Sequence, residues 1–338
     1  MVDPPQRPRR ATRRDVARRA GVSDAVVSYT LSGRAPVSEA TAARVREAIR
    51  ELGYVPNVSA QALKSGSSRA IALIAPNADD PVFANPFFVE YATAVERAAQ
   101  EHELVVFMAT SPPGPGGLRE RAQDFTARHV DGLVIVPGAG DDSADLDALG
   151  VPWVQLNTTA PIDGVFSVGV DLYDGAYQAT THLIEHGYER IGFVGDSLSE
   201  VRAAAWRDAC RAHGVEAGPH VLSGYGREDG YRAAAAMLDG PRPPRALFAA
   251  SDLIALGVLR AAHQRGVRVP EDLALVSFDG SWESEYSWPP LTTVRQPIER
   301  MAKAVIDLLL HRETAPEHRL FRGDLVVRDS CGPHPPGA

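Results

Sequence analysis

The chain has 338 residues, enough for two or three domains of ordinary size. Its net charge of −8 is unevenly distributed. Residues 1–69 hold 13 Arg and Lys against 6 Asp and Glu, a net charge of +7, and the rest holds 22 against 37, a net charge of −15. A basic segment attracts phosphate and an acidic body is repelled by it, so the charges favour a nucleic-acid contact confined to the N-terminal part.

Several classes of protein are disfavoured by composition. No apolar run reaches the roughly 20 residues of a membrane span, and the polar N-terminus has no apolar core of a signal peptide. Cys210 and Cys331 lie far apart and form no disulfide framework, which suits a reducing compartment. The ten His and two Cys show no ligand spacing. We therefore expect a cytoplasmic protein without membrane contact, metal or cofactor.

Residues 12–52 predict three short helices. Thr12 can cap the first helix, with Asp15 placed three residues on, where its charge suits the N-terminus. Gly21 interrupts the pattern, as a tight turn between crossed helices requires, and Ser23 can cap a second helix. The third helix follows Ser38. This is the pattern of a helix-turn-helix, whose second helix enters the major groove by its N-terminal residues.

From residue 70 on, short apolar strands alternate with helical stretches. The alternation predicts parallel sheets covered by helices, and its restart after residue 170 suggests two lobes. The expected strands are 70–75, 104–109, 132–136, 151–156, 190–195, 221–225, 246–251, 273–278, 291–297 and 321–329. The expected helices lie near 87–100, 119–128, 174–186, 200–213, 228–238, 253–265 and 301–311.

Several strings match a known family. They include DVARRAGVSDAVVSYTLSG, VSEATAARVREAIRELGYVPN and VDLYDGAYQATTHLIEHGYERIGFVGD, and the resemblance covers residues 12–330. The chain resembles the lactose-repressor (LacI) family of bacterial transcription regulators. The resemblance implies an all-α helix-turn-helix domain followed by a two-lobed α/β domain like that of periplasmic sugar-binding proteins, with parallel sheets. It also places the helix at 301–311 in the first lobe and the final strand in the second.

The domain boundaries expected from pattern and resemblance are as follows: a disordered basic arm at 1–11, the helix-turn-helix domain at 12–56, a hinge helix and linker at 57–68, an effector-binding and dimerisation domain at 69–330, and a disordered tail at 331–338. Within the effector domain we expect the first lobe at 69–167 and 296–318 and the second at 168–295 and 319–330.

The resemblance also implies which residues contact DNA. Asp24, Ala25 and Tyr29 of the second helix correspond to residues at base edges, whereas Ser23 and Ser28 should touch phosphate, as the helix N-terminus does. Many relatives carry Arg where this chain has Tyr29 and a longer polar residue where it has Ala25, so the operator cannot be copied from a relative. Asp24 either accepts from a cytosine or only stabilises the helix N-terminus.

Three further contacts are expected in the hinge, and Thr12 completes the DNA-contacting set. Asn57 begins a hinge helix that ends at Lys64, a segment too short to be stable alone. By resemblance, Leu63 is a wedge that enters the minor groove and bends the duplex, with Lys64 supplying charge beside it. The alternative for Leu63 is an ordinary apolar linker residue.

The cleft residues implied by the resemblance suit a polyhydroxylated ligand. A carboxylate such as Asp279 can accept from two hydroxyls, a guanidinium such as Arg202 donates as a fork, and aromatic faces can cover the apolar face of a sugar. Phe88 is equally well explained as lobe core, and Asp252 is better explained as a helix cap. The expected effector-binding residues are Asn85, Phe87, Phe88, Asn157, Arg202, Tyr225, Ser251, Asp279, Gln296 and, from its position after the FDG string, Trp282.

Together these observations predict a sequence-specific DNA-binding transcriptional regulator. We expect a homodimeric repressor that binds a pseudo-palindromic operator and whose affinity is controlled by a small ligand between the lobes. Ser251 replaces a frequent Asn and Asn157 a frequent Asp, which favours a neutral sugar first and a nucleobase or nucleoside second. A regulator without a ligand and a solute-binding protein are the alternatives. No GxSxG or Walker loop supports an enzyme.

Overall fold

A computed structural model describes most of the chain: residues 11–32, 35–55, 67–76, 82–138, 143, 146–195, 200–222, 224–311 and 315–332. Its internal contacts divide the chain into two units, Met1–Ser68 and Arg69–Ala338. The expected hinge contacts Asn57, Leu63 and Lys64 lie outside the described residues.

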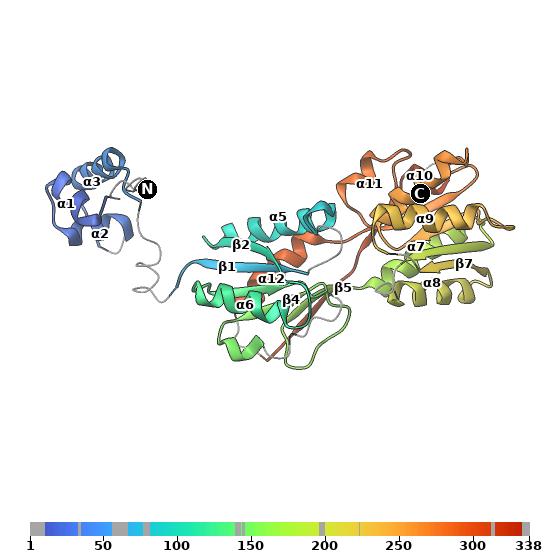
Figure 1. The fold of residues 1–338 in the computed structure, drawn as a ribbon, viewed down its shortest axis with the longest axis horizontal. Coiled ribbons are helices and arrows are strands. Elements are labelled where there is room, and N and C mark those ends of the chain that lie inside the picture. The colour runs from blue at the N-terminus through green and yellow to red at the C-terminus, as the bar shows by residue number, and fades with distance from the viewer. Residues whose placement is uncertain are drawn as a thin grey trace, which may run out of the picture. The chain divides into compact units, whose positions relative to one another are not determined.

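The first unit is a cluster of three helices, α1 (Arg13–Ala20), α2 (Asp24–Ser32) and α3 (Glu39–Leu52) (Figure 1). Thr12 and Asp15 form a reciprocal capping box at the start of α1, and Gly21 ends that helix in the left-handed conformation with φ 66°. The small core consists of the buried side chains Val16, Ala17, Ala20, Val27, Val45 and Ala48.

The first lobe of the second unit is built on a six-stranded parallel sheet in the order β11-β5-β4-β3-β1-β2. Its strands are β1 (Ala70–Ala75), β2 (Val105–Thr110), β3 (Gly132–Ile135), β4 (Trp153–Leu156), β5 (Ser167–Val170) and β11 (His318–Phe321). Its helices are α5 (Pro86–Gln100), α6 (Gly117–Ala127) and α12 (Ile298–Leu310), with the short 3-10 turns η1 (Val82–Ala84) and η2 (Leu146–Leu149).

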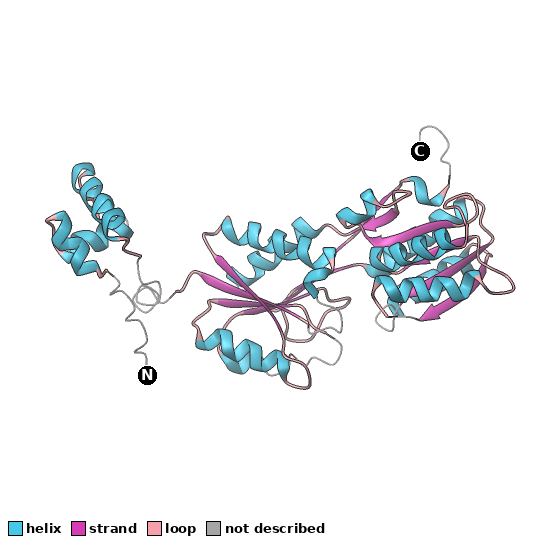
Figure 2. Ribbon diagram, turned by 45° about the horizontal axis from the view of Figure 1, so that its top comes forward, coloured by secondary structure: helices cyan, strands magenta, loops and turns pink. Residues whose placement is uncertain are grey.

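Alternation along the strands gives this sheet two apolar faces. In β1, Ile71 and Leu73 join the core shared with α5 and α12, whereas Ala72 and Ile74 join the core shared with α6. Helices therefore cover both faces of the sheet, as Figure 2 shows.

The second lobe has a matching six-stranded sheet in the order β12-β10-β9-β8-β6-β7, parallel except for the edge strand β12. Its strands are β6 (Arg190–Gly195), β7 (Glu216–Leu222), β8 (Ala246–Ala249), β9 (Ala274–Asp279), β10 (Thr292–Arg295) and β12 (Asp324–Val326). Helix α7 packs on α8 and α9 packs on α10. The helices are α7 (Leu172–Glu185), α8 (Glu200–Ala212), α9 (Arg227–Leu238), α10 (Asp252–Gln264), α11 (Trp282–Tyr286) and the 3-10 turn η4 (Asp329–Cys331).

The structure corrects three boundaries. Strand β5 (Ser167–Val170) was not predicted and pairs in the first sheet, so the first passage between lobes lies after 170 and not at 167. The final strand expected at 321–329 is the shorter β12 and pairs in the second lobe as expected, but the unpredicted β11 (His318–Phe321) precedes it and pairs in the first sheet, so the first lobe reaches residue 321 and not 318. The disordered tail was expected from 331, and this start is wrong because Cys331 is fully buried in η4.

Candidate DNA-binding and effector sites

The N-terminal end of α2 is the candidate DNA-reading surface. The Ser23 hydroxyl accepts the Val26 backbone N–H at 3.3 Å and so caps the helix. Ala25 and Tyr29, one turn apart, are both exposed, Tyr29 to 45%, while Ser28 is half-buried beside them. The exposed part of the Tyr29 side chain is therefore available to a partner.

Asp24 is engaged within the unit. Arg13 donates two hydrogen bonds to its carboxylate, Nε to Oδ1 at 2.7 Å and Nη2 to Oδ2 at 2.5 Å. This pairing raises the pKa of the Arg13 guanidinium. Because Asp24 both occupies the first turn of α2 and ties that helix to α1, the geometry supports the stabilising role more than the base-reading role.

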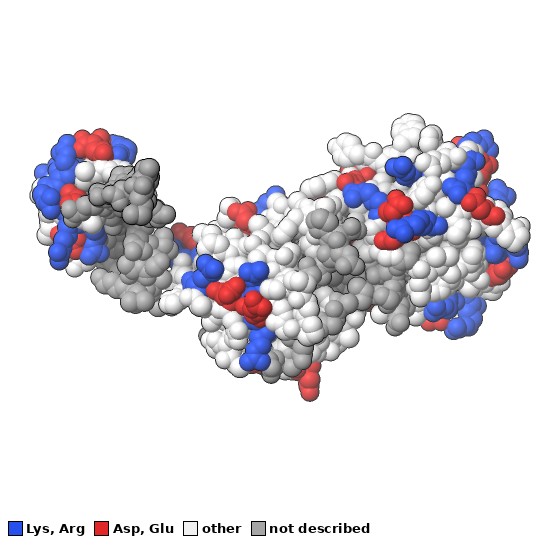
Figure 3. All heavy atoms as spheres, viewed as in Figure 1, with Lys and Arg blue, Asp and Glu red and all other residues white. Residues whose placement is uncertain are grey.

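Thr12 is likewise occupied by the fold. Its hydroxyl donates to Asp15 Oδ2 at 2.6 Å, and its backbone N–H donates to the same oxygen at 2.9 Å. Figure 3 shows Lys and Arg side chains spread over the described surface of this unit, with Asp and Glu between them. Among the described residues, the exposed Arg14 and Arg44 form no ion pair, so their charges are available to phosphate.

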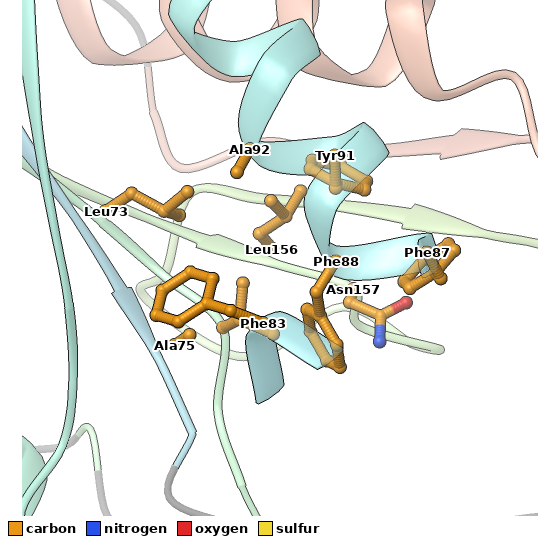
Figure 4. Close-up of a pocket in the computed structure, with 10 residues that line it drawn as sticks. Leu73, Ala75, Phe83, Phe87, Phe88, Tyr91, Ala92, Leu156 and Asn157 are labelled. Atoms are coloured by element: carbon orange, nitrogen blue, oxygen red, sulfur yellow. The ribbon is translucent and has the colours of Figure 1, made fainter. Parts of the chain in front are cut away.

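The first lobe contributes an aromatic pocket at the start of α5. Phe87, Phe88 and Asn157 line it, together with Phe83 and Tyr91, which the sequence did not single out (Figure 4). The Phe87 and Phe88 ring centroids lie 5.5 Å apart at 73°, edge to face. Tyr91 is 3% exposed, and its hydroxyl has no hydrogen-bond partner among the described residues.

Two polar residues flank this pocket differently. Asn157 follows β4 in the left-handed conformation, with φ 61°, and its side chain is exposed. Asn85 instead caps α5, because its side-chain oxygen accepts the Phe87 backbone N–H at 3.1 Å. Phe88 lines this pocket and also packs against the lobe core, so its contact with an effector stays a prediction.

The second lobe contributes a buried polar group centred on Asp279, at the end of β9. Gln296 Nε2 donates to Asp279 Oδ1 at 2.9 Å. Burial raises the pKa of Asp279 to about 8, the nearby Asp252 carboxylate adds to the rise, and Arg202 opposes it. Gln296 is 5% exposed, and its Oε1 has no hydrogen-bond partner among the described residues. The Gln296 Oε1 atom is therefore a buried acceptor to which a ligand could donate a hydrogen bond.

Arg202 connects this polar group to aromatic rings. Its side chain, 4% exposed, lies with its guanidinium carbon 5.9 Å from the Tyr225 ring centroid and 5.4 Å from that of Phe278. The structure therefore brings together Arg202, Tyr225, Asp279 and Gln296, which the sequence left scattered over α8, the segment after β7, β9 and the segment after β10.

Asp252 has a different role from the one expected. Its buried carboxylate accepts from the hydroxyls of Ser277 (2.6 Å), Ser281 (2.8 Å) and Thr293 (2.9 Å). The helix cap is Ser251, whose hydroxyl accepts the Ile254 backbone N–H at 3.2 Å. Asp252 is thus a second carboxylate near Asp279, which sequence reasoning missed because its three partners come from other parts of the second lobe.

Trp282 is half exposed at the start of α11. Its backbone N–H donates to Glu90 Oε1 of the first lobe at 2.8 Å. Burial raises the pKa of Glu90. The backbone of Trp282 therefore forms a hydrogen bond between the two lobes, while about half of the residue stays exposed to solvent.

Comparisons with known proteins agree with this arrangement. A model of the bacterial regulatory proteins of the lacI family matches residues 12–57, and one of a periplasmic binding protein-like domain matches residues 180–331. The HTH-type transcriptional regulator CelR of Thermobifida fusca is 36% identical over 342 residues, covering 96% of this chain and 99% of the relative. The repressor CytR of Escherichia coli strain K12 is 31% identical, covering 95% and 96%.

The chain belongs to the LacI family. Among solved structures, the Lac repressor dimer bound to operator and the anti-inducer ONPF is 25% identical with a TM-score of 0.83, covering 96% of this chain and all of that one. A CelR–cellobiose complex is 31% identical with a TM-score of 0.69, covering 95% and all of that chain.

Membership of the LacI family confirms the predicted fold class and the predicted function as a DNA-binding transcriptional regulator. Among the described residues, no helix combines the length and the apolar character needed to cross a membrane. The individual DNA-binding and effector-binding residues stay predictions, and the structure defines the surroundings of those that lie within the described residues.

Proposed function

We propose that this LacI-family regulator is a homodimeric repressor, without enzymatic activity, that reads operator DNA through α2 and is controlled by a neutral sugar bound between its lobes. The DNA-binding part rests on the exposed Ala25 and Tyr29 at the N-terminal end of α2. A dimer presents two such helices to the two halves of a pseudo-palindromic site, as the solved Lac repressor dimer bound to operator suggests.

The observation that carries the effector assignment is the buried set around Asp279. The carboxyl group of Asp279, the Gln296 amide with its unpaired acceptor oxygen and the Arg202 guanidinium are held together without a ligand. Hydroxyl groups of a sugar both donate and accept, so one sugar ring can satisfy Asp279, Gln296 and Arg202 at once. The aromatic pocket of the first lobe offers apolar surface for the CH face of the same ring.

Cellobiose is the first sugar to test. The relative CelR is 36% identical, and the CelR–cellobiose complex aligns over 95% of this chain. A nucleobase or nucleoside is the second candidate, because the rings of Phe88 and Tyr225 could also stack on a planar base.

The effector assignment is tested by thermal unfolding of the full chain with a panel of cellobiose, other disaccharides, monosaccharides and nucleosides. A ligand at 100 times its dissociation constant stabilises the folded state by about 2.7 kcal/mol, so the cognate ligand raises the midpoint by several degrees. Asp279→Ala should lose this response, and Glu189→Ala, an exposed carboxylate of the same lobe, should keep it. A midpoint raised by nucleosides and by no sugar would replace the sugar with the second candidate.

The DNA-binding part is tested separately by selecting bound sequences from random duplexes. We expect an enriched pseudo-palindrome, and Tyr29→Ala should change the preferred base at one position of each half-site. Light scattering should give the mass of a dimer at micromolar concentration. A selection that enriches no sequence would contradict the proposed operator binding, and only the ligand-binding part of the proposal would remain.

A further inference from the structure

Two histidines and a cysteine meet at the C-terminal end of α7. His182 lies in the last turn of α7, His186 follows it by four residues as the C-cap, and Cys331 ends the 3-10 turn η4. The His182 Nε2 lies 3.3 Å from the Cys331 Sγ, and the two imidazole centroids are 4.6 Å apart. One ligand atom from each of the three residues lies within 4.8 Å of the other two.

Contacts between η4 and the second sheet fix the position of Cys331. The Thr292 Oγ1 lies 2.9 Å from Cys331 Sγ. The neighbouring Ser330 hydroxyl donates to the Leu275 carbonyl oxygen at 2.6 Å and accepts the Thr292 backbone N–H at 2.8 Å. Because these bonds fasten η4 to β9 and β10, the fully buried sulfur has a fixed position opposite the half-buried imidazoles.

We propose that His182, His186 and Cys331 bind one transition-metal ion, with Zn²⁺ as the first candidate. Two imidazole nitrogens and a thiolate are ligands that Zn²⁺ prefers, and the i, i+4 spacing points both imidazoles to one side of the helix. Zn–N bonds of about 2.1 Å and Zn–S bonds of about 2.3 Å place tetrahedral ligand atoms about 3.5 Å apart. The observed separations reach that geometry through small side-chain rotations.

Binding would release the Cys331 thiol proton to solvent as the sulfur–metal bond forms, with no change of oxidation state. Three protein ligands leave the fourth position to water or to another ligand. The alternative is that the sulfur and the His182 nitrogen share only a hydrogen bond.

The proposed metal site is separate from the predicted effector-binding residues. Thr292, which contacts Cys331, begins β10, whereas Gln296 follows the end of that strand, and four residues of strand span about 13 Å. The ion would therefore fasten the C-terminal turn to α7, joining segments 149 residues apart in the chain, rather than contact the effector.

The test uses the full chain without a polyhistidine tag, stripped by a chelator and titrated with Zn²⁺ and Co²⁺. We expect one equivalent of either ion to bind, Co²⁺ to give a thiolate charge-transfer absorption band, and Zn²⁺ to raise the unfolding midpoint. Removal of a residue that only supports a metal ligand typically weakens metal binding by at least about tenfold. Removal of a metal-binding side chain itself should therefore weaken binding by more than about tenfold.

The two test variants are His186→Gln, at a half-buried position that leaves the fold intact, and Cys331→Ser. Matched controls are His213→Gln, at an exposed position directly after α8, and Cys210→Ser, the other buried cysteine. The proposal requires that both test variants weaken binding and that Cys331→Ser abolishes the charge-transfer band, while both controls retain them. Absence of stoichiometric binding, or binding that survives in His186→Gln, would overturn it.

Discussion

The two units each contain an aspartate beside an arginine, and the two pairs differ in what surrounds them. In the first unit, the side chains of Asp24 and Arg13 are 40% and 44% exposed. In the second lobe, Asp279 and Arg202 are each 4% exposed. Water competes for the first pair and screens it, whereas the second pair has lost its hydration and depends on its neighbours. Under the proposed function, the same residue types thus stabilise a local fold in one place and bind a ligand in the other.

Removal of the buried carboxylate should have the largest effect. Asp279→Ala removes a carboxyl group that is protonated at neutral pH and can both donate to and accept from ligand hydroxyls, and leaving one or two of those hydroxyls unpaired in a buried site costs about 3 kcal/mol. We expect effector affinity to fall about 100-fold by calorimetry, with operator affinity in the absence of ligand unchanged. If ligand releases DNA, repression becomes permanent, because ligand acts only through its different affinities for the two lobe arrangements. Wild-type affinity for the effector would place Asp279 outside the site.

Stability should depend on pH through the same residue. The pKa of Asp279 is raised from 3.8 to about 8, so between about pH 4 and pH 8 the folded chain holds a proton that the unfolded chain has released. The contribution of Asp279 to stability is therefore fully present below about pH 4 and falls as pH rises towards 8, by at most about 1.4 kcal/mol per pH unit. Asp279→Asn has no proton to lose, so denaturant unfolding should show a shallower fall towards pH 8.

Some slope should survive in Asp279→Asn, because burial also raises the pKa of Asp252. A variant with the same pH dependence as the wild-type chain would show that Asp279 titrates near its usual range.

The aromatic pocket of the first lobe should contribute less to effector affinity than Asp279 does. Phe88→Ala removes an apolar face from the pocket, worth about 1 kcal/mol beyond simple burial, so we expect a fivefold to tenfold loss of sugar affinity by calorimetry. Phe107→Ala, at an exposed phenylalanine of β2 in the same lobe, is the control and should bind as the wild type does. Equal losses in the two variants would point to a general loss of lobe stability.

The sequence predicted the parts of this molecule that depend on local pattern. The capping pair Thr12 and Asp15 was visible because a capping box needs residues three apart. Strand β5 was missed, since four buried residues carry too little periodicity to be recognised. The fastening of Cys331 was also missed, because nothing near it in the chain shows that Thr292 and His182 lie beside it. The expectation of no metal-ligand spacing overlooked His182 and His186, whose i, i+4 spacing was readable.

The exposed pair of the first unit should give the smallest effect. Asp24→Ala should cost less than about 1 kcal/mol in denaturant unfolding, because solvent screens the ion pair. Arg13→Ala should cost the same, and the double variant no more than either single variant, if the ion pair is the whole contribution of both residues.

The operator preference of Asp24→Ala decides between the two roles that the sequence left open for Asp24, base reading and stabilisation of the helix. A carboxylate already bound by Arg13 reads no base, so the preferred half-site should persist in a binding selection and affinity should rise slightly as a negative charge leaves the phosphates. If Asp24 accepted from a cytosine, discrimination at that position would instead relax by about 1–3 kcal/mol.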